Sequence, residues 1–238
     1  MTVRTFSLAI LVTAAISLPS RAGLLISEVV FNEVGSDTTG EWIEIFNTGP
    51  AAIDLTNYKI GDEEASLGTS ATETMFQFPS GASIAPGQVQ IVAVSATTFQ
   101  TNYGFLPTYE TSATNASVPD LTNYTTWDPD GGQISMSNTN DQALILGPAD
   151  TVLDGVNWGN NTFLNPGLAQ PVLDGQSYQR INAYIDTDTA ADWQVVAGAT
   201  AAARSTPGTV PVPEPATFVL AIGCVLVLSA GRRPIQNR

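Results

Sequence analysis

The sequence contains no histidine. Without an imidazole side chain, the chain cannot perform Ser-His-Asp or Cys-His catalysis, and it can form neither a His-ligated zinc site nor the HExxH site of a zinc protease. The enzymatic mechanisms that remain use paired carboxylates or a carboxylate-bound divalent metal ion. Because the His-dependent mechanisms are excluded, we expect that the protein is not an enzyme.

Cysteine is almost absent as well. The single cysteine, Cys224, lies in an apolar segment close to the C-terminus, so the rest of the chain can form no disulfide. A hydrophobic core alone must hold the fold. Roughly 190 residues lie between the two terminal segments, and a domain of that size buries about 70% of the surface of its unfolded chain, which is enough.

Basic residues are scarce, with 8 against 22 acidic residues. Five of the basic residues lie near the two ends, whereas all acidic residues lie between Glu28 and Glu214. The part between keeps only Lys59, Arg180 and Arg204, which leaves a formal charge of −19. Such a surface repels phosphate, so a nucleic-acid partner is disfavoured. The charge favours either solubility outside the cell or attraction of cations such as Ca²⁺.

The N-terminus has the pattern of an export signal. Arg4 precedes an apolar run over residues 6–16, and small residues end at Ala22. We predict that residues 1–22 are a secretory signal peptide, which signal peptidase removes after Ala22.

The C-terminus has the pattern of a membrane segment. Residues 216–231 are apolar or small with no charge, and Arg232 and Arg233 begin a basic tail that ends at residue 238. As a helix, the fifteen residues 216–230 would span only about 22 Å, less than the ~30 Å of a bilayer core. We predict a short transmembrane helix, with residues 232–238 on the cytoplasmic side and residues 209–215 as the linker before it.

The residues between the two ends favour an all-β fold. Alternating or β-branched apolar runs, separated by Gly and Pro turns, predict strands at residues 24–33, 40–47, 52–62, 75–78, 89–94, 133–137, 143–146, 151–158 and 175–181. One short helix interrupts them, because Ser95 can cap residues 96–103 and Gly104 can end them. We predict a β-sandwich domain over residues 23–208.

The segment GEWIEIFN carries two glutamates, Glu41 and Glu44, three positions apart. Its bulky and β-branched residues predict a strand, on which positions three apart point to opposite faces. The two carboxylates therefore cannot act as a catalytic pair. A buried glutamate needs a partner, and we expect Glu44 to accept hydrogen bonds from a neighbouring loop.

Residues 105–132 have no clear period, and a loop of this length is usually functional or disordered. Its aromatic residues Tyr109, Tyr124 and Trp127 are candidates for a recognition surface, although packing over the core explains each of them more simply.

Asp186 and Asp188, with Asp192, offer carboxylates that could bind a metal ion, whereas Asp128 and Asp130 belong first to a turn signature. A calcium-binding EF-hand loop requires Gly at its sixth position and Glu at its twelfth, and Ala191 and Ala197 stand there instead. Aspartates that satisfy backbone donors within a loop explain the pattern more simply. Calcium is the one cofactor that the sequence brings into consideration.

Five segments carry a likeness to a known family. They are LLISEVVFNEVGSDTTGEWIEIFNTGPAAIDLTNYKIGD, FQFPSGASIAPGQVQIV, FQTNYGF, DQALILGPADTVLDGVNWGN and GQSYQRINAYIDTDTAADW followed by STPG. In this order they resemble the lamin-tail domain of bacterial secreted proteins over residues 24–208. The resemblance implies an immunoglobulin-like β-sandwich. The chain lacks the coiled-coil heptads of nuclear lamins, so filament assembly is not implied.

Pro213, Glu214 and Pro215, followed by the apolar segment and by Arg232 and Arg233, resemble the PEP-CTERM sorting signal of Gram-negative bacteria. This resemblance implies that an exosortase, a membrane transpeptidase-like enzyme, cleaves near the motif. The exported domain would then be released or attached at the cell surface.

These features together predict an exported, non-catalytic module at the cell surface or in the extracellular matrix, which binds extracellular polysaccharide or a surface protein. Two other classes stay open. One is a carboxylate-dependent glycosidase or metal-dependent hydrolase that acts on the matrix, and the other is a calcium-stabilised structural module.

Overall fold

A computed structural model describes residues 23–34, 39–63, 73–169, 172–198 and 203–212. The predicted signal peptide with Ala22, the motif residues 213–215, the apolar segment 216–231 and the basic tail with Arg232 and Arg233 lie outside the described residues. Within the described part, no helix has the length and apolar character needed to cross a membrane.

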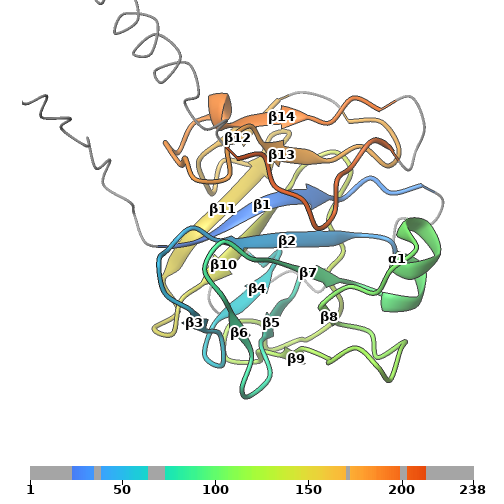
Figure 1. The fold of residues 1–238 in the computed structure, drawn as a ribbon, viewed down its shortest axis with the longest axis vertical. Helices are drawn as coiled ribbons and strands as arrows, with labels where there is room; N and C mark the ends of the chain where they lie inside the picture. Colours follow the sequence, from blue (N-terminus) through green and yellow to red (C-terminus); the bar gives the residue numbers. More distant parts are fainter. Residues whose placement is uncertain (1–22, 35–38, 64–72, 170–171, 199–202, 213–238) are drawn as a thin grey trace, which may run out of the picture.

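Two six-stranded sheets form the body of the molecule (Figure 1). The first sheet has the order β14 (Trp193–Val195), β13 (Tyr178–Arg180), β1 (Leu24–Val30), β2 (Trp42–Asn47), β7 (Val89–Ala93) and β8 (Tyr109–Glu110). The second has the order β12 (Gly167–Leu168), β11 (Val152–Trp158), β10 (Asp141–Leu146), β4 (Lys59–Gly61), β5 (Met75–Gln77) and β9 (Thr122–Asn123). A third, two-stranded sheet pairs β3 (Ile53–Asp54) with β6 (Ser83–Ile84). The predicted β-rich class with one short α-helix is confirmed.

The main core lies between the two large sheets. Ile43 and Ile45 of β2 contribute to it from the first sheet, and Ile145 and Val156 contribute from the second. Trp42 points to the opposite face of β2, where it packs in a smaller cluster with Phe99. The first sheet is thus covered on both faces, which explains why every residue of β2 is buried.

The helix α1 (Ala96–Tyr103) forms as the sequence predicts. The Ser95 Oγ accepts the backbone N–H of Thr98 at 3.2 Å, and Gly104 ends the helix with a φ of 82°. A side chain at that left-handed position would be strained, so glycine is favoured there.

Several strand predictions need correction. The expected strand over residues 52–62 is two strands, β3 and β4, because the chain turns at Leu55–Tyr58 and enters another sheet. The expected strand at residues 175–181 is present as β13 but is not the last, since the 3₁₀ turn η1 (Ala190–Asp192) leads into β14. The short strands β8 and β9 lie within residues 105–132, for which no period was visible.

The prediction of a strand at residues 133–137 is wrong. Ile134 and Met136 are buried and alternate with exposed neighbours, as in a strand, but the backbone bonds to side chains. The N–H groups of residues 135, 136 and 137 donate to carboxylates of Asp62 at 2.8 Å, Glu41 at 2.9 Å and Asp141 at 2.6 Å, in that order. Three acidic side chains thus accept the backbone hydrogen bonds that a neighbouring strand would otherwise accept.

Candidate binding site

Two of the three candidate metal ligands, Asp186 and Asp192, lie beside a cation that belongs to the protein itself. Nη1 of Arg180 lies 3.3 Å from Oδ1 of Asp186 and 3.9 Å from Oδ2 of Asp192. Asp192 also accepts the N–H of Thr187 at 2.7 Å, and Asp186 accepts the N–H of Asp188. Both carboxylates therefore accept backbone N–H groups within their loop, as aspartates in loops commonly do. Within the described ranges, no group of three or more metal-ligating side chains is arranged to hold a metal ion.

Arg180 is fully buried, and its main partner is Asp154. The guanidinium donates from Nη2 to both oxygens of Asp154, at 2.9 and 3.0 Å, and from Nε to the carbonyl of Ile26 at 2.8 Å. It also stacks over the ring of Trp193 at 4.7 Å. Arg180 thereby joins β13 to β11 of the opposite sheet and fixes the orientation of Trp193.

Some of the acidic residues are buried in the interior and are not on the surface. Glu28 and Glu44 lie directly opposite each other on β1 and β2, and both are fully buried. Burial raises the pKa of Glu44 to about 8 and also raises the pKa of Glu28, although hydrogen bonds oppose the shift. As expected, Glu44 accepts a loop donor, the N–H of Gly208 at 2.6 Å.

Glu41 lies in a separate group with Asp62 and Asp141 beneath residues 135–137. Burial raises the pKa of Glu41 to about 10, and the nearby charges of Asp62 and Asp141 add to the shift. Burial likewise raises the pKa of Asp62. Glu41 and Glu44 therefore belong to different environments, as their spacing predicts, and each binds backbone donors.

The three aromatic residues proposed for recognition pack against the body instead. The ring of Tyr109 contacts Phe78 in the main core, and Trp127 packs with Leu144. The Tyr124 hydroxyl donates to Asp150 at 2.8 Å. The simpler explanation, packing over the core, accounts for all three.

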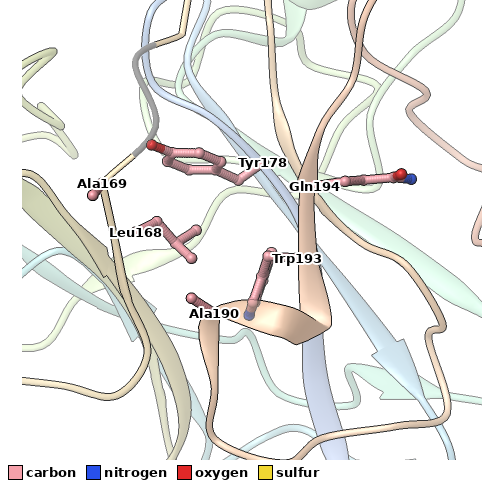
Figure 2. A pocket seen from close by; sticks show the side chains of 6 residues that line it. All are labelled: Leu168, Ala169, Tyr178, Ala190, Trp193 and Gln194. Atoms are coloured by element: carbon pink, nitrogen blue, oxygen red, sulfur yellow. The ribbon is translucent and has the colours of Figure 1, made fainter.

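A pocket of about 60 Å³ opens between β12 and the β13–β14 edge. Figure 2 shows the side chains of Leu168, Tyr178 and Trp193 facing a common space, with Ala190 below it and Gln194 turned away. The pocket thus lies where the edges of the two sheets meet. No sequence pattern predicts the pocket, because its walls come from short strands and from η1, which carry no periodic signal.

The pocket exposes both apolar and polar atoms, and one of its aromatic side chains carries a buried donor. Trp193 is 6% exposed, and its Nε1 has no hydrogen-bond partner among the residues that the structure describes. Figure 2 shows this nitrogen at the end of the ring near Ala190. A buried N–H without an acceptor costs about 1–3 kcal/mol, which an acceptor group inside the pocket would recover. Burial raises the pKa of Tyr178 to about 12, so its hydroxyl stays protonated at neutral pH.

Comparison with known proteins supports the fold. The crystal structure of a DUF4876 family protein from Bacteroides thetaiotaomicron VPI-5482 is similar, with a TM-score of 0.55 at 13% sequence identity, covering 73% of this chain and 70% of that chain. A likeness at this identity shows the fold alone. No curated protein matches the sequence.

The family model of the Lamin Tail Domain matches residues 18–160, more than half of the chain. The strands β13 and β14 and the pocket lie beyond this match, yet β13 pairs directly with β1. The folded unit therefore extends past the matched segment. On the strength of this match, the chain belongs to the lamin tail domain family.

Proposed function

We propose that the protein is an exported, non-catalytic module whose immunoglobulin-like β-sandwich binds extracellular polysaccharide through the pocket between Leu168 and Trp193. The single observation that carries this proposal is the buried indole N–H of Trp193, which has no acceptor in the described part of the chain and lies in a pocket lined by two aromatic rings.

The pocket supports binding rather than hydrolysis. The described residues that line it include no carboxylate. Glu28, Glu41 and Glu44 are instead buried and accept backbone N–H groups. The usual glycosidase mechanism needs two carboxylates about 5–10 Å apart on either side of the glycosidic bond, and the described residues that line the pocket provide no such pair.

The size of the pocket limits what it can hold. Sites for drug-sized molecules have volumes of about 300–1,000 Å³, far above the 60 Å³ found here. The pocket therefore fits one substituent of a longer chain that lies across the surface. A substituent with an acceptor oxygen and a small apolar part, as polysaccharides carry, would bond Trp193 and contact Leu168 and Ala190.

Export and sorting rest on the two ends of the sequence. Residues 1–22 have the pattern that signal peptidase recognises, and residues 213–215 with the apolar segment and Arg232 and Arg233 have the pattern of an exosortase substrate. We place the mature domain at the cell surface or in the matrix of a Gram-negative bacterium, after transient membrane anchoring. The strongly acidic mature chain is consistent with a soluble extracellular module.

The test is binding of the purified chain to a panel of neutral, acidic and N-acetylated polysaccharides, measured by calorimetry. The Trp193→Phe variant keeps an aromatic wall and removes the N–H, so we expect roughly 3–10-fold weaker binding. Thr101→Ala, on the exposed face of α1, serves as the control and should bind normally. Absence of binding to every polymer, or release of sugar from any of them, would contradict the proposal.

A further inference from the structure

Residues 204–211, which we call the strap, cross the outer face of the first sheet at the C-terminal end of the described chain. Figure 1 shows this orange-red segment passing in front of β1 and β2. The strap is not part of either sheet, and the family match ends well before it.

Two buried carboxylates hold the middle of the strap. Glu28 accepts the backbone N–H of Thr206 at 2.8 Å and its hydroxyl at 2.9 Å. Glu44, its neighbour across β1 and β2, accepts the N–H of Gly208 at 2.6 Å. Ser27 also donates to Glu44, at 2.7 Å. The sheet thus presents a pair of acceptors to the N–H groups of Thr206 and Gly208, which lie in a turn closed by the bond from the Thr209 N–H to the Thr206 carbonyl at 3.1 Å.

Further hydrogen bonds fix the two ends of the strap. The carbonyl of Arg204 accepts the N–H of Ser177 at 3.0 Å, and the carbonyl of Pro211 accepts the N–H of Ala183 at 2.9 Å. Ser205 donates to the hydroxyl of Tyr103, on α1, at 3.1 Å. The chain is therefore attached up to Pro211, two positions before Pro213, although the sequence predicts a linker from residue 209.

Polar contacts rather than a core hold this segment. Ser205 is its one buried residue, while Gly208 and Thr209 are exposed. Segments with few buried apolar contacts open at a lower free energy than the body of a domain. Opening would also return Glu28 and Glu44 to water, which removes the desolvation cost of two opposed carboxyl groups.

We propose that the strap undocks as one unit while the sandwich stays folded. The eight residues of the strap, once extended, would add up to about 27 Å between the domain and the chain that follows residue 211. This movement goes beyond the proposed function, and only its use depends on that function. If the C-terminus is a membrane segment, undocking gives a processing enzyme access to residues 213–215 and lets the domain stand off from the bilayer.

Amide hydrogen exchange of the purified chain, followed by NMR at neutral pH, tests the undocking. In the unaltered protein, we expect the amides of Thr206 and Gly208 to exchange at least tenfold faster than that of Ile45 in β2. Exchange of all three at one rate would mean that the strap opens only with global unfolding, and would overturn the proposal.

The Thr206→Val variant tests whether the strap is a unit. It keeps the side-chain shape and removes the hydroxyl, which donates to Glu28 and accepts from the side chain of Gln179. We expect roughly tenfold faster exchange at the distant Gly208 amide and no change at Ile45. Faster exchange at position 206 alone would mean local fraying and would also overturn the proposal. Thr101→Ala is the control, and its strap amides should be unchanged.

Neither measurement uses a polysaccharide or a processing enzyme. A chain that binds no polymer but shows coupled exchange would contradict the proposed function and leave the undocking intact. A chain that binds polymer through Trp193 but whose strap opens only with the sandwich would contradict the undocking and leave the proposed function intact.

Discussion

The guanidinium of Arg180 and the carboxylate of Asp154 form a buried ion pair across the two sheets, with Nη2 donating to both oxygens. Asp154 also accepts the N–H of Ile26 at 2.6 Å, so three strands meet at one carboxylate. Both side chains are at most 3% exposed. A charge removed from water to this extent is tolerated only when its partner is present.

Replacement of Asp154 by Ala should therefore lower the free energy of unfolding by about 3–5 kcal/mol, because it leaves the Arg180 charge buried without its main partner. Urea denaturation followed by tryptophan fluorescence measures the loss. The exposed Asp130→Asn variant is the control and should stay within about 0.5 kcal/mol. The double variant Asp154→Leu with Arg180→Met should regain most of the loss. A single variant as stable as the unaltered chain would show that the pair does not hold the sheets together.

The raised pKa of Glu44 predicts how stability depends on pH. Between the pKa of about 4.5 in the unfolded chain and about 8 in the folded chain, the folded state holds a proton that the unfolded state has lost. Stability should therefore fall as the pH rises, by about 1.4 kcal/mol per pH unit for each such group. Glu41, with a pKa of about 10, acts in the same direction, as do Glu28 and Asp62.

The melting temperature should accordingly decrease steadily from pH 5 to pH 8. The Glu44→Gln variant keeps a carbonyl for the N–H of Gly208 and cannot titrate, so its melting temperature should fall less steeply. Glu28, opposite on β1, and Tyr103, on α1, are the other titratable groups near this site, and both remain in the variant. Equal slopes for the two proteins would show that Glu44 does not hold the extra proton.

Local chemistry allowed parts of the fold to be predicted. Ser95 and Gly104 mark α1 correctly, because a cap and a left-handed glycine act within a few residues. Residues 133–137 have the alternation of a strand, but no sequence pattern shows that Glu41, 95 positions away from Met136, takes the place of a neighbouring strand.

The candidate site could be predicted from the sequence even less well than the fold. Trp193 follows a loop of aspartates that drew attention as metal ligands, and its neighbours in the pocket come from another sheet edge. The contact between Arg180 and Asp154 depends on which strands face each other. Long-range register of this kind is set by the packing of whole sheets and is not visible in a single sequence. For the same reason, the sequence does not predict that Thr206 and Gly208, in a short segment without a clear period, donate to the buried carboxylates.

Calcium should not stabilise the protein. Asp186 and Asp192 face the guanidinium of Arg180, which already supplies positive charge to both carboxylates. Thermal melting in the presence of millimolar Ca²⁺ and, separately, of a chelator should therefore give the same midpoint within about 1 °C. A midpoint that rises with Ca²⁺ and falls with chelator would instead support the calcium-stabilised module.

The helix cap offers a smaller and more local test. The Oγ of Ser95 accepts the N–H of Thr98 and lies 3.1 Å from the hydroxyl of Thr114. Ser95→Ala should lower the free energy of unfolding by about 1 kcal/mol, since one N–H of the first turn loses its acceptor. Ser95→Asp keeps an acceptor and is expected to lose less. If both variants lose the same amount in urea denaturation, capping is not the cause.

Two variants of Glu41 test whether its side chain is needed as a hydrogen-bond acceptor or as a negative charge. Its Oε2 accepts the N–H of Met136 at 2.9 Å, and its pKa of about 10 means that the side chain is neutral at pH 7. Glu41→Gln preserves a neutral acceptor of the same shape and should cost less than about 1 kcal/mol. Glu41→Leu removes the acceptor and should cost about 1–3 kcal/mol, because the Met136 N–H stays buried without a partner. Urea denaturation of the two variants at pH 7 gives the comparison. If the Gln variant were as unstable as the Leu variant, the negative charge itself would be required, and the group of Glu41, Asp62 and Asp141 would then have to be explained by a bound cation rather than by its backbone donors.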